Sequence, residues 1–363
     1  MLLLILLSMS ALNSATMFSH SLASPVYEVA MSSQGKSFAV RTLDDRVYFF
    51  NSGGASILEK SYPRNVKVIA VSDGGSYLGV GGIDGNLRIY KESEDVFNLK
   101  ADNAISGLAI SNNGEIIAYS SNTKLGIISF LKPFTQINLG DYIYSVGISR
   151  DGSEIVAGLS NGSLIILNQK GKIVKNIDLG NLIYEVEVSE DGSTILARTT
   201  KRIVILTSSG DIIFQKELKT GDASLAGKAD RFDVVSDNAV EIYDFYGHLL
   251  YKIKAEGVQS IDTNEDSNLL LVGTWGGDVK LLNLSALILN KNENINISAH
   301  QPEINASQKI GGIKNETPVK VIKEIEGIKE YKMGHFTFED ILLAFLAGVI
   351  ISSMTLIYFN TKK

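Results

Sequence analysis

Short apolar runs follow one another along most of this chain, and polar, glycine-containing turns separate them. Residues 66–90 give the clearest example: an apolar run, a Ser72-Asp73-Gly74 turn, a second apolar run, an Asp84-Gly85 turn and a third apolar run. Apolar runs bounded by such turns are typical of β-strands, and Asp-Gly pairs supply the positive φ of tight hairpins. This stretch therefore predicts three consecutive antiparallel strands.

The same pattern recurs through the chain. In each copy, the turn after the first strand starts at an anchor residue: Ser32, Ser72, Ser111, Ser149, Ser189, a position near Leu225, and Asn264. The anchors lie roughly 36 to 40 residues apart, a spacing typical of propeller repeats. The sixth copy lacks the turn signature, but its third strand, over 239–247, matches residues 162–171. The chain thus contains seven repeats.

A small four-stranded unit cannot bury both faces of its sheet alone, so neighbouring units must pack face to face. Radial closure buries all of these faces and leaves few edges. We therefore expect an all-β fold, a seven-bladed β-propeller of four-stranded blades over residues 24–290.

From residue 32 to about 290 the repeats resemble WD-repeat and quinoprotein-like propeller sequences. They depart from that pattern because Gly-His is absent from the repeat starts and the single tryptophan, Trp275, lies in a turn. The resemblance implies the propeller class and no particular activity. Two segments compete to supply the outer strand that closes the ring: Met17-Phe18-Ser19-His20, or Leu287-Ile288-Leu289. Cleavage after Ala23 would make the first option impossible.

The N-terminal segment begins with a leucine-rich run and continues to small residues, as a secretory signal does. We predict a signal peptide over 1–23, with cleavage after residue 15 or 23.

The C-terminal region has a different composition. Residues 291–335 are rich in Asn, Lys, Glu and Ile and predict a stalk. Residues 341–359 carry no charge, and a helix of that length covers about 28 Å, which is close to the thickness of a membrane core. We therefore predict a transmembrane helix over 336–360. Lysines at 362 and 363 place the tail, 361–363, in the cytoplasm and the propeller outside the cell.

An extracytoplasmic location would make five Asn-x-Ser/Thr sequences candidate glycosylation sites. They lie in the ring and the stalk: Asn161, Asn283, Asn296, Asn305 and Asn315.

The composition argues against several functions. The net charge is −6, and Lys and Arg are scattered among Asp and Glu, so no basic stripe points to a nucleic-acid partner. The chain has no cysteine, which excludes disulfides, thiolate metal sites and a cysteine nucleophile. The 4 histidines follow no metal or catalytic spacing. We expect neither an enzyme nor a bound cofactor.

Two groups of residues are candidates for a functional site. The first strand of each repeat should line the central channel, and the positions two before each anchor are mostly small, except Glu187 and Asp262. These carboxylates could hold a cation together with Glu28 and Glu185, or could be solvated in a wet channel, which is the expected outcome. In the second group, Tyr27, Tyr144 and Tyr184 stand five before their anchors, and Trp275 should lie on the same face.

Aromatic side chains with a polar tip suit a protein-binding surface, although the tyrosines could instead pack between blades. The leading prediction is a membrane-anchored, extracytoplasmic propeller that binds or scaffolds a partner protein or envelope polymer at the cell surface. The alternative is a ligand- or metal-dependent sensor or enzyme that uses the channel carboxylates. A third possibility, a cytoplasmic propeller on a tail-anchored helix, would be ruled out by glycans on Asn296 or Asn305.

Overall fold

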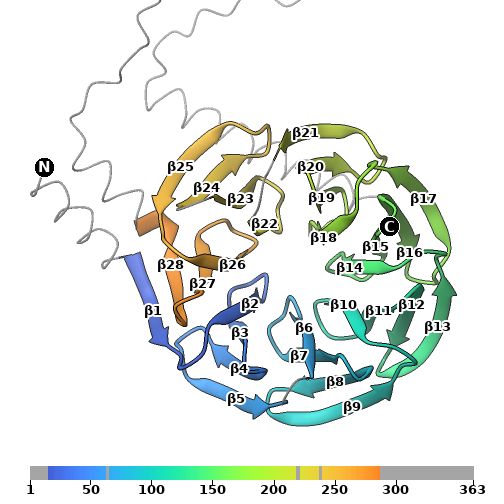
Figure 1. Ribbon diagram of the computed structural model, residues 1–363, viewed down its shortest axis with the longest axis horizontal. Helices are drawn as coiled ribbons and strands as arrows, with labels where there is room; N and C mark the ends of the chain where they lie inside the picture. Colours follow the sequence, from blue (N-terminus) through green and yellow to red (C-terminus); the bar gives the residue numbers. More distant parts are fainter. Residues whose placement is uncertain (1–14, 63–64, 218–220, 237–238, 287–363) are drawn as a thin grey trace, which may run out of the picture. The chain divides into compact units, whose positions relative to one another are not determined.

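A computed structural model describes residues 15–62, 65–217, 221–236 and 239–286. These residues form seven antiparallel four-stranded sheets arranged as blades around a central axis (Figure 1). The predicted fold class, an all-β seven-bladed propeller, is confirmed for this part of the chain.

Each blade runs outward from an innermost strand. The first three blades are β2 (Val26–Met31), β3 (Ser37–Thr42), β4 (Arg46–Asn51) and β5 (Ser56–Ser61); β6 (Val66–Val71), β7 (Tyr77–Gly82), β8 (Asn86–Lys91) and β9 (Glu94–Lys100); and β10 (Ile105–Ile110), β11 (Ile116–Ser121), β12 (Lys124–Ser129) and β13 (Lys132–Asn138). Blades 4 and 5 are β14 (Ile143–Ile148), β15 (Glu154–Leu159), β16 (Ser163–Asn168) and β17 (Ile173–Asp178); and β18 (Ile183–Val188), β19 (Thr194–Thr199), β20 (Arg202–Thr207) and β21 (Ile212–Glu217). Blades 6 and 7 are β22 (Ala223–Leu225), β23 (Arg231–Ser236), β24 (Ala239–Asp244) and β25 (Leu249–Lys254); and β26 (Val258–Thr263), β27 (Leu269–Thr274), β28 (Asp278–Asn283) and β1 (Thr16–Ser21).

The N-terminal strand β1 closes the ring. It pairs antiparallel with β28 and so becomes the outer strand of blade 7, which decides between the two predicted closing segments. The ring thus includes residues before the predicted domain start at 24. A chain cut after Ala23 would lack β1, whereas a chain cut after Ala15 would keep it. Residues 287–289, the rival segment, lie outside the described residues.

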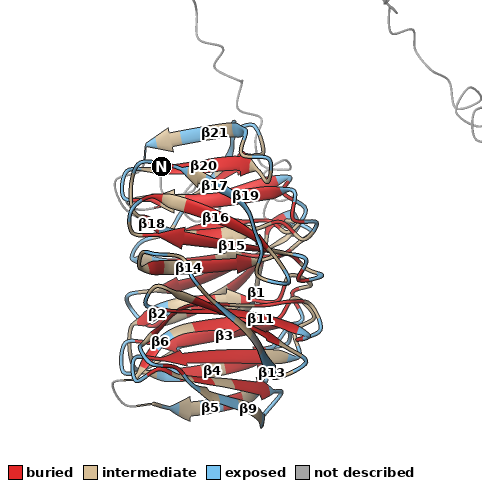
Figure 2. Ribbon diagram, turned by 90° about the vertical axis from the view of Figure 1, so that its right-hand side faces the viewer, coloured by how far each residue is buried: buried red, intermediate tan, exposed pale blue. Residues whose placement is uncertain are grey.

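The apolar core consists of seven clusters, one between each pair of neighbouring blades. The two middle strands of each blade are accordingly the most buried, and the outer strands are more exposed (Figure 2). Each blade therefore depends on both neighbours for its burial, as expected of a closed ring.

The irregular sixth repeat is anchored at Ala226, one residue from the predicted position. The Ala226 N–H donates to the carbonyl of Arg231, as the Ser32 N–H donates to Ser37 in blade 1. In blades 1 to 5 the third residue after the anchor is a glycine with positive φ, whereas blade 6 has Ala229 with φ 54°. Because glycine adopts this conformation most easily, its replacement by alanine explains why the turn signature is missing.

The anchor turns also join the blades. We call the face where the innermost strands begin the entrance face and the face where they end the exit face. On the exit face, in blades 3, 4, 5 and 7, the residue after the anchor donates its backbone N–H to the equivalent carbonyl of the next blade, at 2.7–2.9 Å: Asn112 to Arg150, Arg150 to Glu190, Glu190 to Gly227, and Glu265 to Ser33. In blades 1 and 2 the second residue after the anchor donates instead, Gln34 to Asp73 and Gly74 to Asn112. The repeated turn thus has a second role as an inter-blade belt.

No helix within the described part of the chain is long and apolar enough to cross a membrane. The predicted stalk, transmembrane helix and tail fall on 291–363, and the start of the predicted signal peptide falls on 1–14, all outside the described residues. These assignments stay predictions.

Candidate functional site

A cavity of about 740 Å³ opens at the entrance face and is lined by residues from all seven blades. A second cavity of about 250 Å³ lies along the innermost strands toward the exit face. Four acidic residues border both cavities: Glu28, Glu185, Glu187 and Asp262. The central channel is therefore strongly polar, and both groups of predicted site residues contribute to it.

The three predicted tyrosines all line the entrance cavity. The Tyr144 ring packs edge-on against Tyr184 of the next blade, with centroids 5.9 Å apart, and against Tyr142 at 4.8 Å. Tyr144 and Tyr184 therefore pack between blades, which was the alternative expectation for the tyrosines. Tyr27 and Tyr184 nevertheless remain 44% and 46% exposed. Tyr142 was missed because it precedes the strand and stands outside the repeat position.

Trp275 lies on the entrance face but does not line the cavity. It is 52% exposed in the β27–β28 turn, and its backbone N–H donates to the carbonyl of Gly257, just before β26. Leu43 and Ile83 hold the equivalent turn position in blades 1 and 2 and are 50% and 54% exposed. Three adjacent blades, 7, 1 and 2, therefore present a large apolar side chain around the cavity.

Blades 1 and 5 carry the same Tyr-Glu-Arg unit beside the cavity. In blade 1, Arg41 bonds to Glu28 at 3.0 Å and its guanidinium lies 4.1 Å from the Tyr27 ring centroid. In blade 5, Arg198 bonds to Glu185 at 2.7 Å and lies 5.6 Å from the Tyr184 centroid.

The two arginines were not among the predicted site residues, although the sequence carries the signal. Tyr-Glu-Val is followed by Arg-Thr at the same spacing in the first and fifth repeats. Glu and Arg are direct cross-strand partners in both blades. Within each unit, the arginine donates a hydrogen bond to the glutamate and lies against the tyrosine ring.

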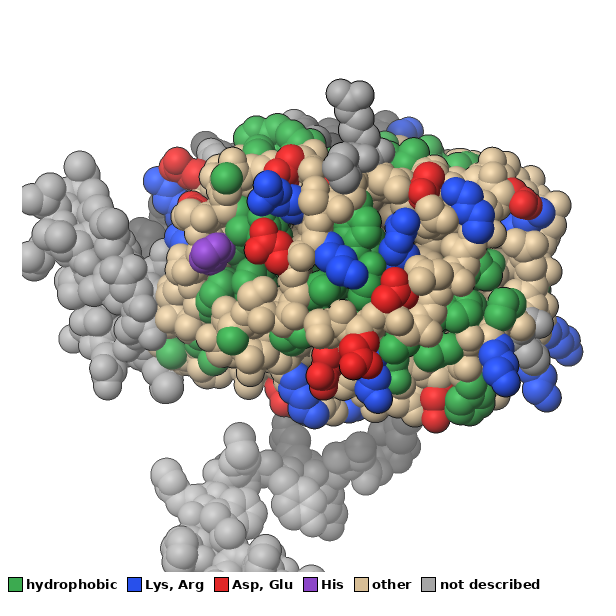
Figure 3. All heavy atoms as spheres, turned by 90° about the horizontal axis from the view of Figure 1, so that it is seen from below, with side chains coloured by type: hydrophobic (Ala, Val, Ile, Leu, Met, Phe, Trp, Pro, Cys, Tyr) green, Lys and Arg blue, Asp and Glu red, His purple; other side chains and the backbone are tan. Residues whose placement is uncertain are grey.

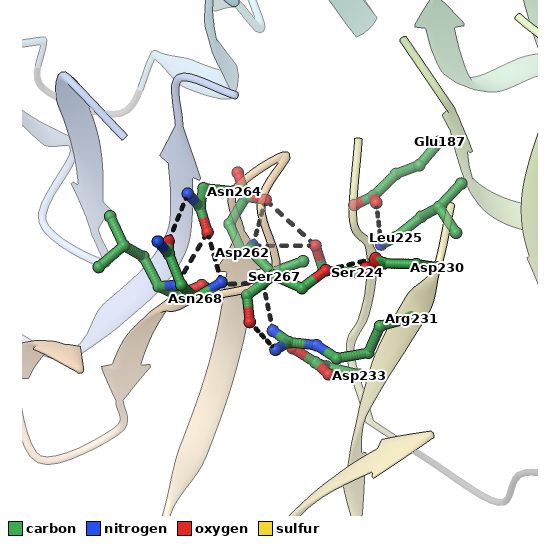
Figure 4. A network of polar contacts seen from close by, with 12 residues as sticks. Glu187, Ser224, Leu225, Asp230, Arg231, Asp233, Asp262, Asn264, Ser267 and Asn268 are labelled. Carbon is green, nitrogen blue, oxygen red and sulfur yellow. Dashed lines mark hydrogen bonds and ion pairs between the residues drawn. The ribbon is translucent and has the colours of Figure 1, made fainter. Parts of the chain in front are cut away.

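Glu187 and Asp262 connect blades. Glu187 accepts a hydrogen bond from the backbone N–H of Leu225 at 2.5 Å, and Asp262 accepts one from the N–H of Met31 at 2.6 Å (Figure 4 shows the first). Asp262 also accepts from the Ser224 hydroxyl at 3.1 Å. In the described residues, no group of three or more His, Cys, Asp or Glu side chains could hold a metal ion. The hydrogen bonds of Glu187 and Asp262 therefore indicate a structural role, as acceptors that join neighbouring blades.

These contacts follow a pattern that blades 1, 4, 5, 6 and 7 share. The innermost strand is an edge strand of its sheet, so the N–H groups on its free edge have no partner within the sheet. Side chains two or four before the anchor accept from the next blade's innermost strand: Ser224 from Thr263, Asp222 from Ile261, Ser260 from Val29, Ser145 from Val186 and Glu28 from Ile69. Gly147 shows the opposite solution, because a Cβ there would lie 2.9 Å from Val188 of the next blade. Where strands approach closely, small residues are needed.

Burial perturbs the channel carboxyls. Burial, together with the charge of Asp222, raises the pKa of Glu185 to about 8. Burial is the main cause of the raised pKa of Asp262, which is about 7. Burial, followed by the charge of Asp262, raises the pKa of Glu187 well above its ordinary value. Protonated carboxyls are therefore present in the channel near neutral pH.

At the exit face, one arginine connects opposite sides of the ring. The Arg150 guanidinium of blade 4 bonds to Glu190 of blade 5 at 2.5 Å and to Glu265 of blade 7 at 2.7 Å. The Ser33 hydroxyl of blade 1 donates to Glu190 at 2.5 Å. Burial, then the nearby Glu190, raises the pKa of Asp73 to about 7. The exit end of the channel is therefore crossed by an ion-pair network, while the entrance end is open.

A buried arginine of the irregular blade 6 joins that blade to blade 7. Arg231 bonds to Asp233 at 2.8 Å and to the Thr263 hydroxyl at 2.6 Å, and it also donates to the carbonyl of Ser267 (Figure 4). Arg231 is 6% and Asp233 0% exposed. This pair lies away from the channel and supports the blade interface.

Two of the five candidate glycosylation sites lie in the described residues. Asn161 is exposed in the β15–β16 turn on the entrance face, and its Oδ1 accepts the Ser163 N–H at 2.9 Å. Asn283 is half-buried and accepts the Ala286 N–H at 3.1 Å. Asn296, Asn305 and Asn315 lie outside the described residues.

In comparisons with known proteins, no family model and no curated sequence matched this chain. The fold and the geometry of the channel are therefore the basis for a functional assignment.

Proposed function

We propose that this protein is a membrane-anchored, extracytoplasmic β-propeller that binds a partner protein or an envelope polymer through its entrance face. The observation that carries the proposal is the exposure of Tyr27 and Tyr184 at the rim of an open cavity of about 740 Å³. Aromatic side chains with a polar tip give large contact areas at low entropic cost and dominate many interfaces.

The surroundings of the cavity fit this role. Trp275, Leu43 and Ile83 provide apolar contacts on adjacent blades, and each is at least half exposed. Five of the residues that line the cavity are acidic and three are basic, so a protrusion with basic or hydrogen-bond-donating groups would complement it. The inter-blade bonds keep the rim rigid, which limits the entropy lost on binding.

The test is crosslinking of the protein in its own membranes, followed by identification of the peptides joined to the ring. We expect one stoichiometric partner attached near Tyr184 or Trp275. Tyr184→Ala should weaken the complex by about 2 kcal/mol if this side chain is central to the interface, which is about thirtyfold in affinity. Tyr246→Ala is the matched control, since Tyr246 is an aromatic residue, 70% exposed, in an exit-face turn. Equal effects of the two variants would reject the assignment of the entrance face.

The second candidate is a ligand- or cation-dependent sensor or enzyme in the channel. The observation in its favour is the raised pKa of Glu185, Glu187 and Asp262, since perturbed carboxyls gather at functional sites. It predicts that cations or small sugars raise the melting temperature and that Asp262→Asn removes the effect. No response of the wild-type chain would reject this candidate.

A further inference from the structure

The outer edge of blades 4, 5 and 6 carries an apolar surface that the entrance face does not explain. Each outer strand there begins with two apolar residues, and five of these six side chains are 46–66% exposed: Ile173, Val174, Ile212, Leu249 and Leu250. We call this set the apolar rim. The equivalent outer strands elsewhere begin with Ser-Ile, Glu-Asp, Lys-Pro and Thr-Met, so the feature is confined to three adjacent blades.

The parts of the apolar rim lie on neighbouring outer strands, because the turn before each outer strand packs on the outer strand of the preceding blade. Gly210, two residues before Ile212, lies against Lys175 and Ile177 of β17. Gly247, two residues before Leu249, lies against Phe214 of β21. Exposed apolar side chains gathered on adjacent blades point to an interaction site.

Lysines accompany the blade 4 part of the apolar rim, whereas the exposed Asp211 precedes Ile212 in blade 5. Lys170, Lys172 and Lys175 flank Ile173 and Val174, and all three are exposed. Within the described ranges, none of the three forms an ion pair with a carboxylate. On the side of the ring that Figure 3 shows, by contrast, acidic and basic side chains are interspersed. Apolar side chains beside unpaired lysines complement an anionic lipid surface.

The face on which the chain leaves the ring also supports a lipid surface as the partner of the apolar rim. The Leu284 N–H donates to the carbonyl of Asn268, as the Phe245 N–H donates to Asp230 at the start of the turn before β25. The described chain therefore leaves on the exit face, where the strands of the apolar rim begin. The sequence that follows contains the uncharged stretch over 341–359 that is predicted to span the membrane.

We propose that the apolar rim lies against the surface of the anchoring membrane and binds its anionic lipids. This inference rests on the proposed membrane anchor. The rim contact would orient the ring, with the lysines at the headgroups and the apolar side chains at the boundary of the acyl chains.

The experiment uses the full chain reconstituted in vesicles of anionic lipids with brominated acyl chains, which quench tryptophan at short range. Ile173→Trp in a Trp275→Phe background reports on the apolar rim. Ser56→Trp in the same background is the matched control, since both residues are the first of an outer strand. The native Trp275 reports on the entrance face. We expect quenching and a blue shift for Ile173→Trp only, and Val174→Trp is a second reporter should Ile173→Trp fail to fold.

Replacing Lys170, Lys172 and Lys175 by Ser should abolish the quenching of the rim reporter. Equal emission from Ile173→Trp and Ser56→Trp in a membrane-integrated chain would overturn this inference and leave the proposed function standing. A rim that is shielded from aqueous quenchers but not quenched by brominated lipid would also overturn it, in favour of a protein partner. Release of the chain by an alkaline wash would instead refute the anchor, and with it the proposed function.

Discussion

The closure of the ring by β1 leads to a quantitative prediction. The Phe18 ring of β1 packs against Phe38 and Phe50 of blade 1, with centroids 5.3 Å and 5.5 Å away. Gly54, which has φ +80°, lies beside this ring, and a Cβ at Gly54 would overlap Phe18. Phe18 therefore joins blade 7 to blade 1 at the point where the two ends of the ring meet.

Phe18→Ala should destabilise the protein measurably. Truncating a fully buried phenylalanine costs about 3–5 kcal/mol, and Phe18 is half-buried, so about 2 kcal/mol is expected. For a ring of this size, that loss lowers the melting temperature by about 4–8 °C. The assay is thermal unfolding of the full chain in detergent, followed by circular dichroism.

Met17→Ala is the control, because Met17 lies on the same strand and is 54% exposed. Its effect should stay within about 0.5 kcal/mol. Gly54→Ala should be strongly destabilising in the native chain and less so beside Phe18→Ala, since the overlap is then removed. Equal melting temperatures for Phe18→Ala and Met17→Ala would refute closure by β1.

Three further predictions concern the channel. Glu187→Ala should cost about 1–3 kcal/mol because it leaves the Leu225 N–H without its acceptor, and Glu187→Gln should restore most of the loss in denaturant titrations. The pKa of Glu185 rises from 4.5 to about 8 on folding, so its contribution to stability is complete below pH 4.5 and is lost as the pH rises through about 8. The melting temperature should therefore fall between pH 5 and pH 9, and Glu185→Gln should flatten that profile; an unchanged profile would contradict the assignment. Arg150→Gln should lower stability by about 1–2 kcal/mol, since two glutamates then face each other without their cation; calorimetry with no change would show that this network is dispensable.

The repeat pattern was readable from the sequence because each blade is a local structure. Runs of apolar residues and the turn glycines act over a few positions, so strands and hairpins can be recognised wherever turns such as Ser72-Asp73-Gly74 occur. The count of seven blades follows from the anchor spacing together with the third strand of the sixth repeat, which matches that of the fourth. The sixth anchor could be placed only approximately, near Leu225, because Ala229 holds a position that glycine occupies in blades 1 to 5.

The roles of the site residues were decided by contacts between blades. The sequence marked Glu187 and Asp262 as unusual but left open a cation site or free solvation, since the acceptors and donors lie about 38 residues or more apart. Only the register between innermost strands places their carboxylates on the unpaired N–H groups of the next blade. The same holds for Arg150, whose partner Glu265 is 115 residues away.

The sequence by itself determined the blade: its length, its strand order, its turns and the residues that face the channel. Tertiary structure decided how the blades are joined, which segment closes the ring, which tyrosines stay exposed and where the apolar rim lies. The physical reason is the range of the interactions. Periodicity and turn chemistry act within a repeat, whereas closure, inter-blade hydrogen bonds and surface continuity depend on strands that meet only when the ring is complete.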